Sequence, residues 1–173
     1  MRSRSSVKEK IVSLEQLAAE SDQLRSAGKR VVATNGCFDI LHVGHVRYLA
    51  AARKLGDVLV VGLNGDSSVR QLKGEGRPVN REQDRAEVLA ALESVDYVTI
   101  FPELRAANFL QAAQPAIYAK GGDYTADTLD SEERAVLEEF GTKIEIIPFE
   151  KGYSTSQLLT RIGAKSEDGS DNR

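Results

Sequence analysis

The sequence predicts an α/β fold, in which a doubly wound, Rossmann-like parallel sheet carries helices on both faces. Two observations lead to this prediction. Short apolar runs of strand length alternate with longer segments whose apolar residues recur at helical spacing. The apolar runs are also nearly continuous, which is typical of parallel strands covered on both faces. Ligands of such sheets sit beyond the carboxyl ends of the strands, so the residues after each strand are the functional candidates.

Composition narrows the class of protein. The chain has 173 residues, of which 41% are hydrophobic and 28% charged, as expected for a single globular domain. Its net charge of -3 argues against a general nucleic-acid binder. No apolar run is long enough for a membrane span, and no signal peptide is evident. With Cys37 as the single cysteine, an internal disulfide is excluded. We therefore expect a cytoplasmic protein that binds small molecules.

The first half of the chain is predicted to begin with a capped helix. Ser13 and Gln16 form a capping box, and Gly28 ends the helix. The expected elements are a helix over 13–28, a strand over 31–33, a helix over 43–54, a strand over 58–63 and a polar loop over 64–79.

The second half continues the same alternation, with Asn80 and Gln83 expected to open a helix. The expected elements are a helix over 80–92, a strand over 95–101, a weaker helix over 103–111, a strand over 115–119, a loop over 120–125, a helix over 130–140, a strand over 143–148 and a helix over 154–162. We therefore divide the chain into an N-terminal extension (1–29), one functional domain (30–162) and a disordered tail (163–173).

Both of the chain's two histidines, His42 and His45, fall at the start of the helix after the first strand. Free backbone N–H groups and the positive dipole end already favour an anion there. Two imidazoles can add hydrogen bonds to phosphate oxygens and stabilise charge that develops in a transition state. Gly36 permits a tight turn, and Gly44 lets a nucleotide approach the backbone closely.

Other interpretations of this segment are weaker. The two histidines could bind zinc, but the chain offers neither a third histidine nor a pair of cysteines. They could be structural, capping a loop or packing in the core, although a shared helix start beside two glycines favours a functional role. Cys37 is expected to be a small buried filler, because no base residue is placed to activate it.

These residues form a motif that resembles a known family. Asn35-Gly36-Cys37-Phe38-Asp39 followed by His42-Val43-Gly44-His45 is similar to the phosphate-binding signature of the cytidylyltransferase-like nucleotidyltransferase superfamily. Three further stretches, in this order and spacing, resemble the adenylyltransferases that make ADP-heptose from heptose 1-phosphate. They are Lys73-Gly74 with Arg77-Pro78-Val79-Asn80, Lys120-Gly121-Gly122-Asp123-Tyr124, and Gly152-Tyr153-Ser154-Thr155-Ser156. The likeness runs from about residue 30 to residue 162.

The resemblance implies roles for individual residues. Catalysis would rest on His42, His45 and Lys73. Nucleotide contacts would come from Asn35, Gly36, Cys37, Phe38, Asp39, Gly44, Arg85, Lys120, Gly121, Asp123, Ser154, Thr155 and Ser156. Acceptor contacts are assigned to Asn64, Asp66 and Arg77, although Asn64 and Asp66 could equally end the second strand.

Several of these residues have a second interpretation. Lys73 lies in the polar loop, where its long side chain could fold over a triphosphate or simply be solvated. Arg77 carries the same ambiguity, and Arg85 could be a surface ion-pair partner. The paired glycines before Asp123 allow close backbone approach to a ribose or base, but also suit an ordinary turn. Ser154 with Gln157 forms a capping box that is compatible with a second phosphate site.

The resemblance implies transfer of AMP from ATP to heptose 1-phosphate, giving ADP-heptose, a lipopolysaccharide core precursor, and pyrophosphate. The acceptor phosphate is already ionised, so the reaction needs alignment and charge stabilisation rather than a strong base. Mg²⁺ would bridge the phosphates with few protein ligands. A homodimer, and a separate kinase that supplies heptose 1-phosphate, are also expected. The alternatives are a cytidylyltransferase acting on glycerol 3-phosphate or another alcohol phosphate, and a nucleotide-binding module without catalysis.

Overall fold

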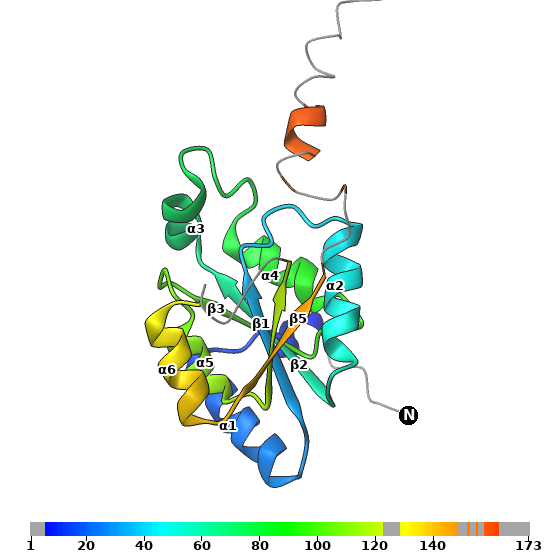
Figure 1. Cartoon of the computed structure of the whole chain (residues 1–173). Helices are drawn as coiled ribbons and strands as arrows, with labels where there is room; N and C mark the ends of the chain where they lie inside the picture. The colour runs from blue at the N-terminus through cyan, green and yellow to red at the C-terminus, as the bar shows by residue number, and fades with distance from the viewer. Residues whose placement is uncertain (1–5, 123–128, 149–151, 153–154, 156–157, 163–173) are drawn as a thin grey trace, which may run out of the picture.

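A computed structural model describes residues 6–122, 129–148, 152, 155 and 158–162. Its centre is a five-stranded sheet in the order β3-β2-β1-β4-β5, and every neighbouring pair of strands is parallel (Figure 1). The strands are β1 (Val31–Gly36), β2 (Val58–Asn64), β3 (Tyr97–Phe101), β4 (Ile117–Gly121) and β5 (Lys143–Ile147). This arrangement confirms the predicted doubly wound α/β fold.

Helices cover both faces of the sheet. The helical elements are η1 (Val7–Lys10), α1 (Leu14–Ser26), α2 (Val43–Arg53), α3 (Asp66–Lys73), α4 (Glu82–Ala90), α5 (Ala107–Ala113) and α6 (Ser131–Glu139). Helices α1, α5 and α6 pack on one face, while η1, α2 and α4 pack on the other (Figure 1). None of the helices in the described parts of the chain combines the length and apolarity that a membrane crossing requires.

The core has two halves because successive strand residues point to opposite faces of the sheet. Val32 belongs to the half under α2 and α4, whereas Val31 belongs to the half under α1 and α5. In that second half the rings of Phe101 and Phe109 stack with their centroids 5.9 Å apart. A Cβ atom at Gly62 would come within 2.8 Å of the Phe109 ring, so this strand position requires glycine.

The N-terminal segment packs against the sheet and its core. Leu17 of α1 is completely buried in the core half that contains Phe109. Ile11 forms a parallel bridge with Val98, so the segment before α1 pairs with β3, an end strand of the sheet. The ammonium group of Lys10 also donates to the carbonyl of Val95 at 2.8 Å. The segment treated as an extension therefore completes one edge of the sheet.

The structure corrects two local predictions. The expected loop over residues 64–79 contains α3, whose first backbone N–H, that of Asp66, donates to Glu82 Oε2 at 2.7 Å. A carboxylate sixteen residues away thus satisfies this helix end, and local patterns do not show such a contact. The helix expected from Asn80 begins at Glu82 instead. Asn80 is not its cap, because its side-chain amide donates to the carbonyl of Asp39 at 2.8 Å.

Candidate active site

The order of the strands reverses between the neighbouring strands β1 and β4. From β1 the chain continues outward through β2 to β3, whereas β4 and β5 lie on the other side. A ligand crevice is expected at such a switch point, beyond the carboxyl ends of the strands. That edge is at the top of Figure 1, where the loop after β1 leads into α2 and where α3 also lies. The residues of the histidine motif therefore meet the expected ligand position.

The two histidines lie together at the start of α2. His42 is the N-cap residue and His45 is in the first turn; their rings stack with centroids 3.8 Å apart. The backbone N–H of His42 donates to Nδ1 of His45 at 3.4 Å, and the ring edge of Phe38 packs against His45. A neutral imidazole that accepts at Nδ1 carries its proton on Nε2. His45 is thus held as an Nε2–H donor.

The surroundings of both histidines favour the neutral imidazole at pH 7. Burial, with a smaller contribution from the neighbouring His42, lowers the pKa of His45 to about 4. Burial also lowers the pKa of His42. Neutral imidazoles can donate hydrogen bonds to a phosphate without first losing or gaining a proton.

We expect the ring of His45 to stay neutral in the free protein until the pH falls to about 4. Because its pKa is lower in the folded state than in the unfolded chain, its neutral form contributes stability that is complete above about pH 6.5. That stability is lost as the pH falls through the folded value. A two-dimensional NMR titration of the imidazole resonances measures this, and a midpoint near that of an ordinary histidine would contradict the buried stack.

Asp39 connects the loop after β1 to residues 77–80. Its buried carboxylate accepts hydrogen bonds from Arg77 Nε, from the Val79 N–H at 2.7 Å and from the Asn80 N–H at 3.1 Å. Burial alone would raise the pKa of Asp39, but the hydrogen bonds from Arg77, Asn80 and Val79 outweigh it and lower that pKa. The structure therefore pairs Asp39 with Arg77, whereas the motif suggested that each contacts a substrate.

Arg85 is also turned toward the protein. Its side chain is 1% exposed, and Nη1 donates to the carbonyls of Cys37 at 2.6 Å and Asn64 at 2.9 Å. Nε donates to the carbonyl of Asn80 at 3.0 Å, and Nη2 pairs with Asp66 Oδ1 at 2.7 Å. Arg85 is thus not the surface ion-pair partner considered above, and the donors of its guanidinium contact protein groups. Arg85 instead joins the ends of β1 and β2 to α3 and the 77–80 segment.

The proposed acceptor residues Asn64 and Asp66 lie in this same network. Asn64 is 3% exposed, and its side-chain amide donates to the Ser68 hydroxyl at 3.3 Å. Asp66 begins α3 and is paired with Arg85. Both residues therefore support the backbone at the end of β2.

Lys73 is the last residue of α3, not a residue of a flexible loop, and Gly74 follows it with a φ of 91°. Its side chain is exposed, and its charge reaches Cys37, since it lowers the pKa of that thiol. Burial has the larger, opposite effect, and the pKa of Cys37 is raised overall. A raised thiol pKa agrees with Cys37 as a packing residue. The lowering effect of Lys73 on this pKa indicates that its ammonium is within electrostatic reach of the β1 loop, the segment between β1 and α2.

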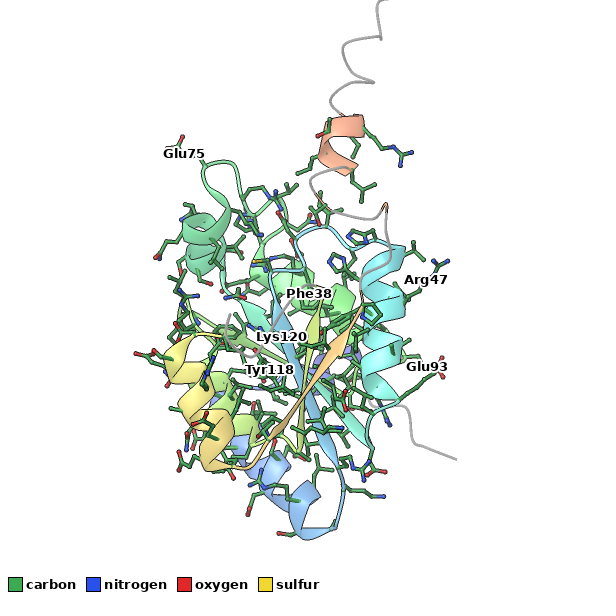
Figure 2. All side chains as sticks on the ribbon, in the orientation of Figure 1. Phe38, Arg47, Glu75, Glu93, Tyr118 and Lys120 are labelled. Carbon is green, nitrogen blue, oxygen red and sulfur yellow. The ribbon has the colours of Figure 1, made fainter. Side chains whose placement is uncertain are left out.

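Lys120 and Asn35 meet at the switch point. Nζ of Lys120 donates to Oδ1 of Asn35 at 2.8 Å, and the hydroxyl of Tyr118 donates to the same oxygen at 2.6 Å. Lys120 is 7% exposed, and burial lowers its pKa. Figure 2 shows Lys120 and Tyr118 side by side at the centre of the molecule, below Phe38. Gly121 ends β4 directly after Lys120.

Two tyrosines of this region, Tyr48 and Tyr118, are not indicated by any sequence motif. Tyr118 contacts Asn35, as described above. Tyr48 of α2 donates its hydroxyl proton to the carbonyl of Ala119 at 3.0 Å, and its oxygen lies 2.8 Å from Thr34 Oγ1. Burial raises the pKa of Tyr48 to about 12, so the hydroxyl keeps its proton. A tyrosine on a helix face has no local signal for such a role, because its partners come from two strands.

The glycines and the Ser154–Ser156 stretch can be placed only in part. A Cβ atom at Gly36 would lie 3.0 Å from the Phe38 ring, and Gly44 lies in α2 between the two histidines. The Thr155 hydroxyl donates to the carbonyl of Ile40 at 3.3 Å, which brings residue 155 to the loop before His42. Three predicted site residues, the tail and part of the last predicted helix lie outside the described residues. These site residues are Asp123, Ser154 and Ser156.

The chain is similar to known proteins over most of its length. A family model described as cytidylyltransferase-like matches residues 33–161. The bifunctional protein HldE of Geobacter sulfurreducens is 47% identical over 153 residues, which are 88% of this chain and 31% of that protein. The protein of the same name from Citrifermentans bemidjiense is 50% identical over the same shares. The chain therefore spans about a third of the length of these curated relatives.

Two solved structures are also similar. The lipopolysaccharide core biosynthesis protein from Thermoplasma volcanium is 30% identical with a TM-score of 0.59, and the match covers 73% of this chain and all of that one. A pantoate–β-alanine ligase from Francisella tularensis, complexed with an ATP species and β-alanine, has a TM-score of 0.57. At 16% identity, with 90% of this chain and 76% of the ligase covered, that likeness shows the fold alone.

Proposed function

Because this chain belongs to the cytidylyltransferase-like family, we propose that it transfers AMP from ATP to heptose 1-phosphate, giving ADP-heptose and pyrophosphate. The observation that carries the proposal is the pair of stacked, neutral histidines at the switch point of the sheet. The choice of ATP and a heptose rests on the stretches that resemble heptose 1-phosphate adenylyltransferases and on the similarity to the HldE proteins.

The proposed reaction needs positioning more than proton transfer. An ionised phosphate oxygen of the acceptor attacks the α-phosphorus of ATP, and the bond from that phosphorus to the bridging oxygen of the leaving pyrophosphate breaks. His42 and His45 donate hydrogen bonds to phosphate oxygens on which charge increases. The Asp39 and Arg85 contacts hold the β1 loop, so the donors are in place before the substrates bind.

We propose that Mg²⁺ enters as part of the substrate, MgATP. Among the side chains described at this edge, the imidazoles suit phosphate oxygens, and the carboxylates of Asp39 and Asp66 are already paired with Arg77 and Arg85. Bound in this way, Mg²⁺ would supply charge neutralisation along the triphosphate. The homodimer and the kinase that supplies the sugar phosphate remain predictions.

The proposal predicts faster pyrophosphate release from ATP with heptose 1-phosphate than from CTP with glycerol 3-phosphate, both in Mg²⁺. A panel of nucleotides crossed with acceptors, read by coupled pyrophosphate detection, measures this. Equal or faster turnover of CTP with glycerol 3-phosphate would move the chain to the cytidylyltransferases, whose name the family model carries. Binding of ATP without pyrophosphate release on any acceptor would favour a nucleotide-binding module.

We also predict that Lys73→Ala lowers kcat and kcat/KM together, with little change in KM for ATP. The Lys73 ammonium is exposed and within electrostatic reach of the β1 loop, so it can meet charge that develops on the departing pyrophosphate. Steady-state kinetics measure the effect. Lys54→Ala is the control, because Lys54 is an exposed lysine at the C-terminal end of α2, away from the two histidines. A rise in KM alone would indicate a ground-state contact, and no change would indicate a solvated surface lysine.

A further inference from the structure

The side chain of Asn35 is held in one orientation by two donors. Lys120 Nζ lies 2.8 Å from one end of its amide group, and the Tyr118 hydroxyl lies 2.6 Å from the same end. Amide oxygen and nitrogen are hard to distinguish by shape, but an ammonium group can only donate. The end that faces Lys120 must therefore be the oxygen, and the NH₂ group must face the other way.

The NH₂ group of Asn35 is available to a ligand. Asn35 is half-buried, and its Nδ2 makes no hydrogen bond to another residue in the part of the chain that the structure describes. Because Nδ2 lacks such a partner and is not a fully buried atom, it is open to solvent. Asn35 is the penultimate residue of β1. This strand pairs with β4 at the point where the strand order reverses.

The Lys120 ammonium on the oxygen side of the Asn35 amide favours an anion on the NH₂ side. A cation that donates to the amide oxygen draws electron density from the NH₂ group and makes it a stronger donor, because hydrogen bonds in a chain polarise one another. The Lys120 ammonium is buried, lies 4.7 Å from the centroid of the Tyr118 ring and experiences the charge of Glu133. It is held against the amide oxygen of Asn35.

We propose that Lys120 and Tyr118 are positioning residues that aim the Asn35 NH₂ group at a phosphate oxygen of the substrates. This deepens the proposed function and rests on it. It also gives Lys120 a different role from the direct nucleotide contact that the motif implied. The phosphate can belong to the nucleotide or to the acceptor, and both use the same chemistry.

The test replaces Asn35 with Asp. This variant keeps an oxygen for Lys120 and Tyr118 at nearly unchanged volume, so the fold persists and the melting temperature does not fall. It puts a negative oxygen where the NH₂ group was, and we expect kcat/KM to fall by about 10²-fold or more. Asn35→Ala removes the donor without adding repulsion and should cost about tenfold. Gln23→Glu on the exposed surface of α1 adds the same charge and is expected to leave activity unchanged.

A double-mutant cycle separates positioning from direct contact. If Lys120 acts through Asn35, Lys120→Met should lower kcat/KM in the wild-type background and have little further effect in Asn35→Ala. Multiplicative losses would show that Lys120 contacts the substrate itself and would overturn its positioning role. Wild-type kinetics and stability in Asn35→Asp would overturn the phosphate contact.

Calorimetry with ATP and with heptose 1-phosphate shows which of the two phosphates Asn35 contacts. It also tests the role of Asn35 separately from AMP transfer. Weaker binding of one ligand by Asn35→Asp assigns the contact to that ligand, and unchanged binding with lower kcat assigns it to the transition state. If the wild-type protein binds ATP but transfers no AMP, the proposed function fails. A loss of ATP affinity in Asn35→Asp would then still support the Asn35 assignment.

Discussion

Replacing either His42 or His45 with alanine should lower kcat by about 10²–10³, the loss expected when one preorganised donor to a transition-state oxyanion is removed. Each imidazole is neutral, and the backbone contact of His45 Nδ1 leaves its Nε2–H to point at a ligand. Pyrophosphate release under saturating substrates measures the effect. His45→Gln, which restores an N–H donor of different reach, should recover part of the loss.

Folding has to be measured on the same variants, because the two rings also pack on each other and on Phe38. We expect a small change in the free energy of unfolding, since both side chains are only half-buried at the start of a helix. Val46→Ala in the same turn is the matched control, because Val46 is 40% exposed and outside the ring stack. A folded variant with wild-type turnover, or a variant that simply unfolds, would count against the catalytic role.

Replacing Arg85 with methionine should destabilise the protein by about 3–5 kcal/mol, the cost typical of removing one partner from a buried charged network. Methionine fills similar space, but it leaves the carbonyls of Cys37, Asn64 and Asn80 without their donor. Asp66 also loses its ion-pair partner. Urea unfolding measures the change, and kcat should fall as well, because the loop that carries the histidines loses its anchor.

Two further variants sharpen this experiment. Arg85→Lys keeps the charge but not the planar fork of donors, so it should rescue only part of the stability. Arg105→Met is the control, because the Arg105 side chain in the ion pair with Asp130 is exposed and such a pair is worth little. If Arg85→Met unfolds at the wild-type urea concentration and loses only nucleotide affinity, Arg85 is a ligand contact, as the motif resemblance implied.

Asp39 and Arg85 lie where the motif predicts, but their side chains contact other partners than the motif implies. The motif placed both residues at the ligand edge of the sheet, and the structure does bring them there. A motif does not say which way a side chain turns, however. Asp39 binds the 77–80 segment and Arg85 binds three carbonyls, so both stabilise the loop instead of being open to a ligand.

Predictions from local patterns agreed best with the structure where one element supplies all the interactions. The Ser13–Gln16 box caps α1 as expected, because both partners lie within one helical turn. α3 was missed because its first N–H is satisfied by Glu82 from the next helix. The Asn80–Gln83 box failed because Asp39 engages Asn80 first. In both failures a distant residue outweighed the local preference.

The alternation of strands and helices and the pairing of His42 with His45 follow from the amino-acid sequence alone. Both depend on short spacings along the chain, namely the periodicity of apolar residues and a separation of three residues in one helix. The contact of Lys120 with Asn35 and the contacts by which Arg85 joins four segments depend instead on how the chain folds. Apart from Asn80, the partners of Lys120 and Arg85 lie 19 to 85 residues away in the sequence. They meet because the packing of the parallel sheet brings the strand ends together.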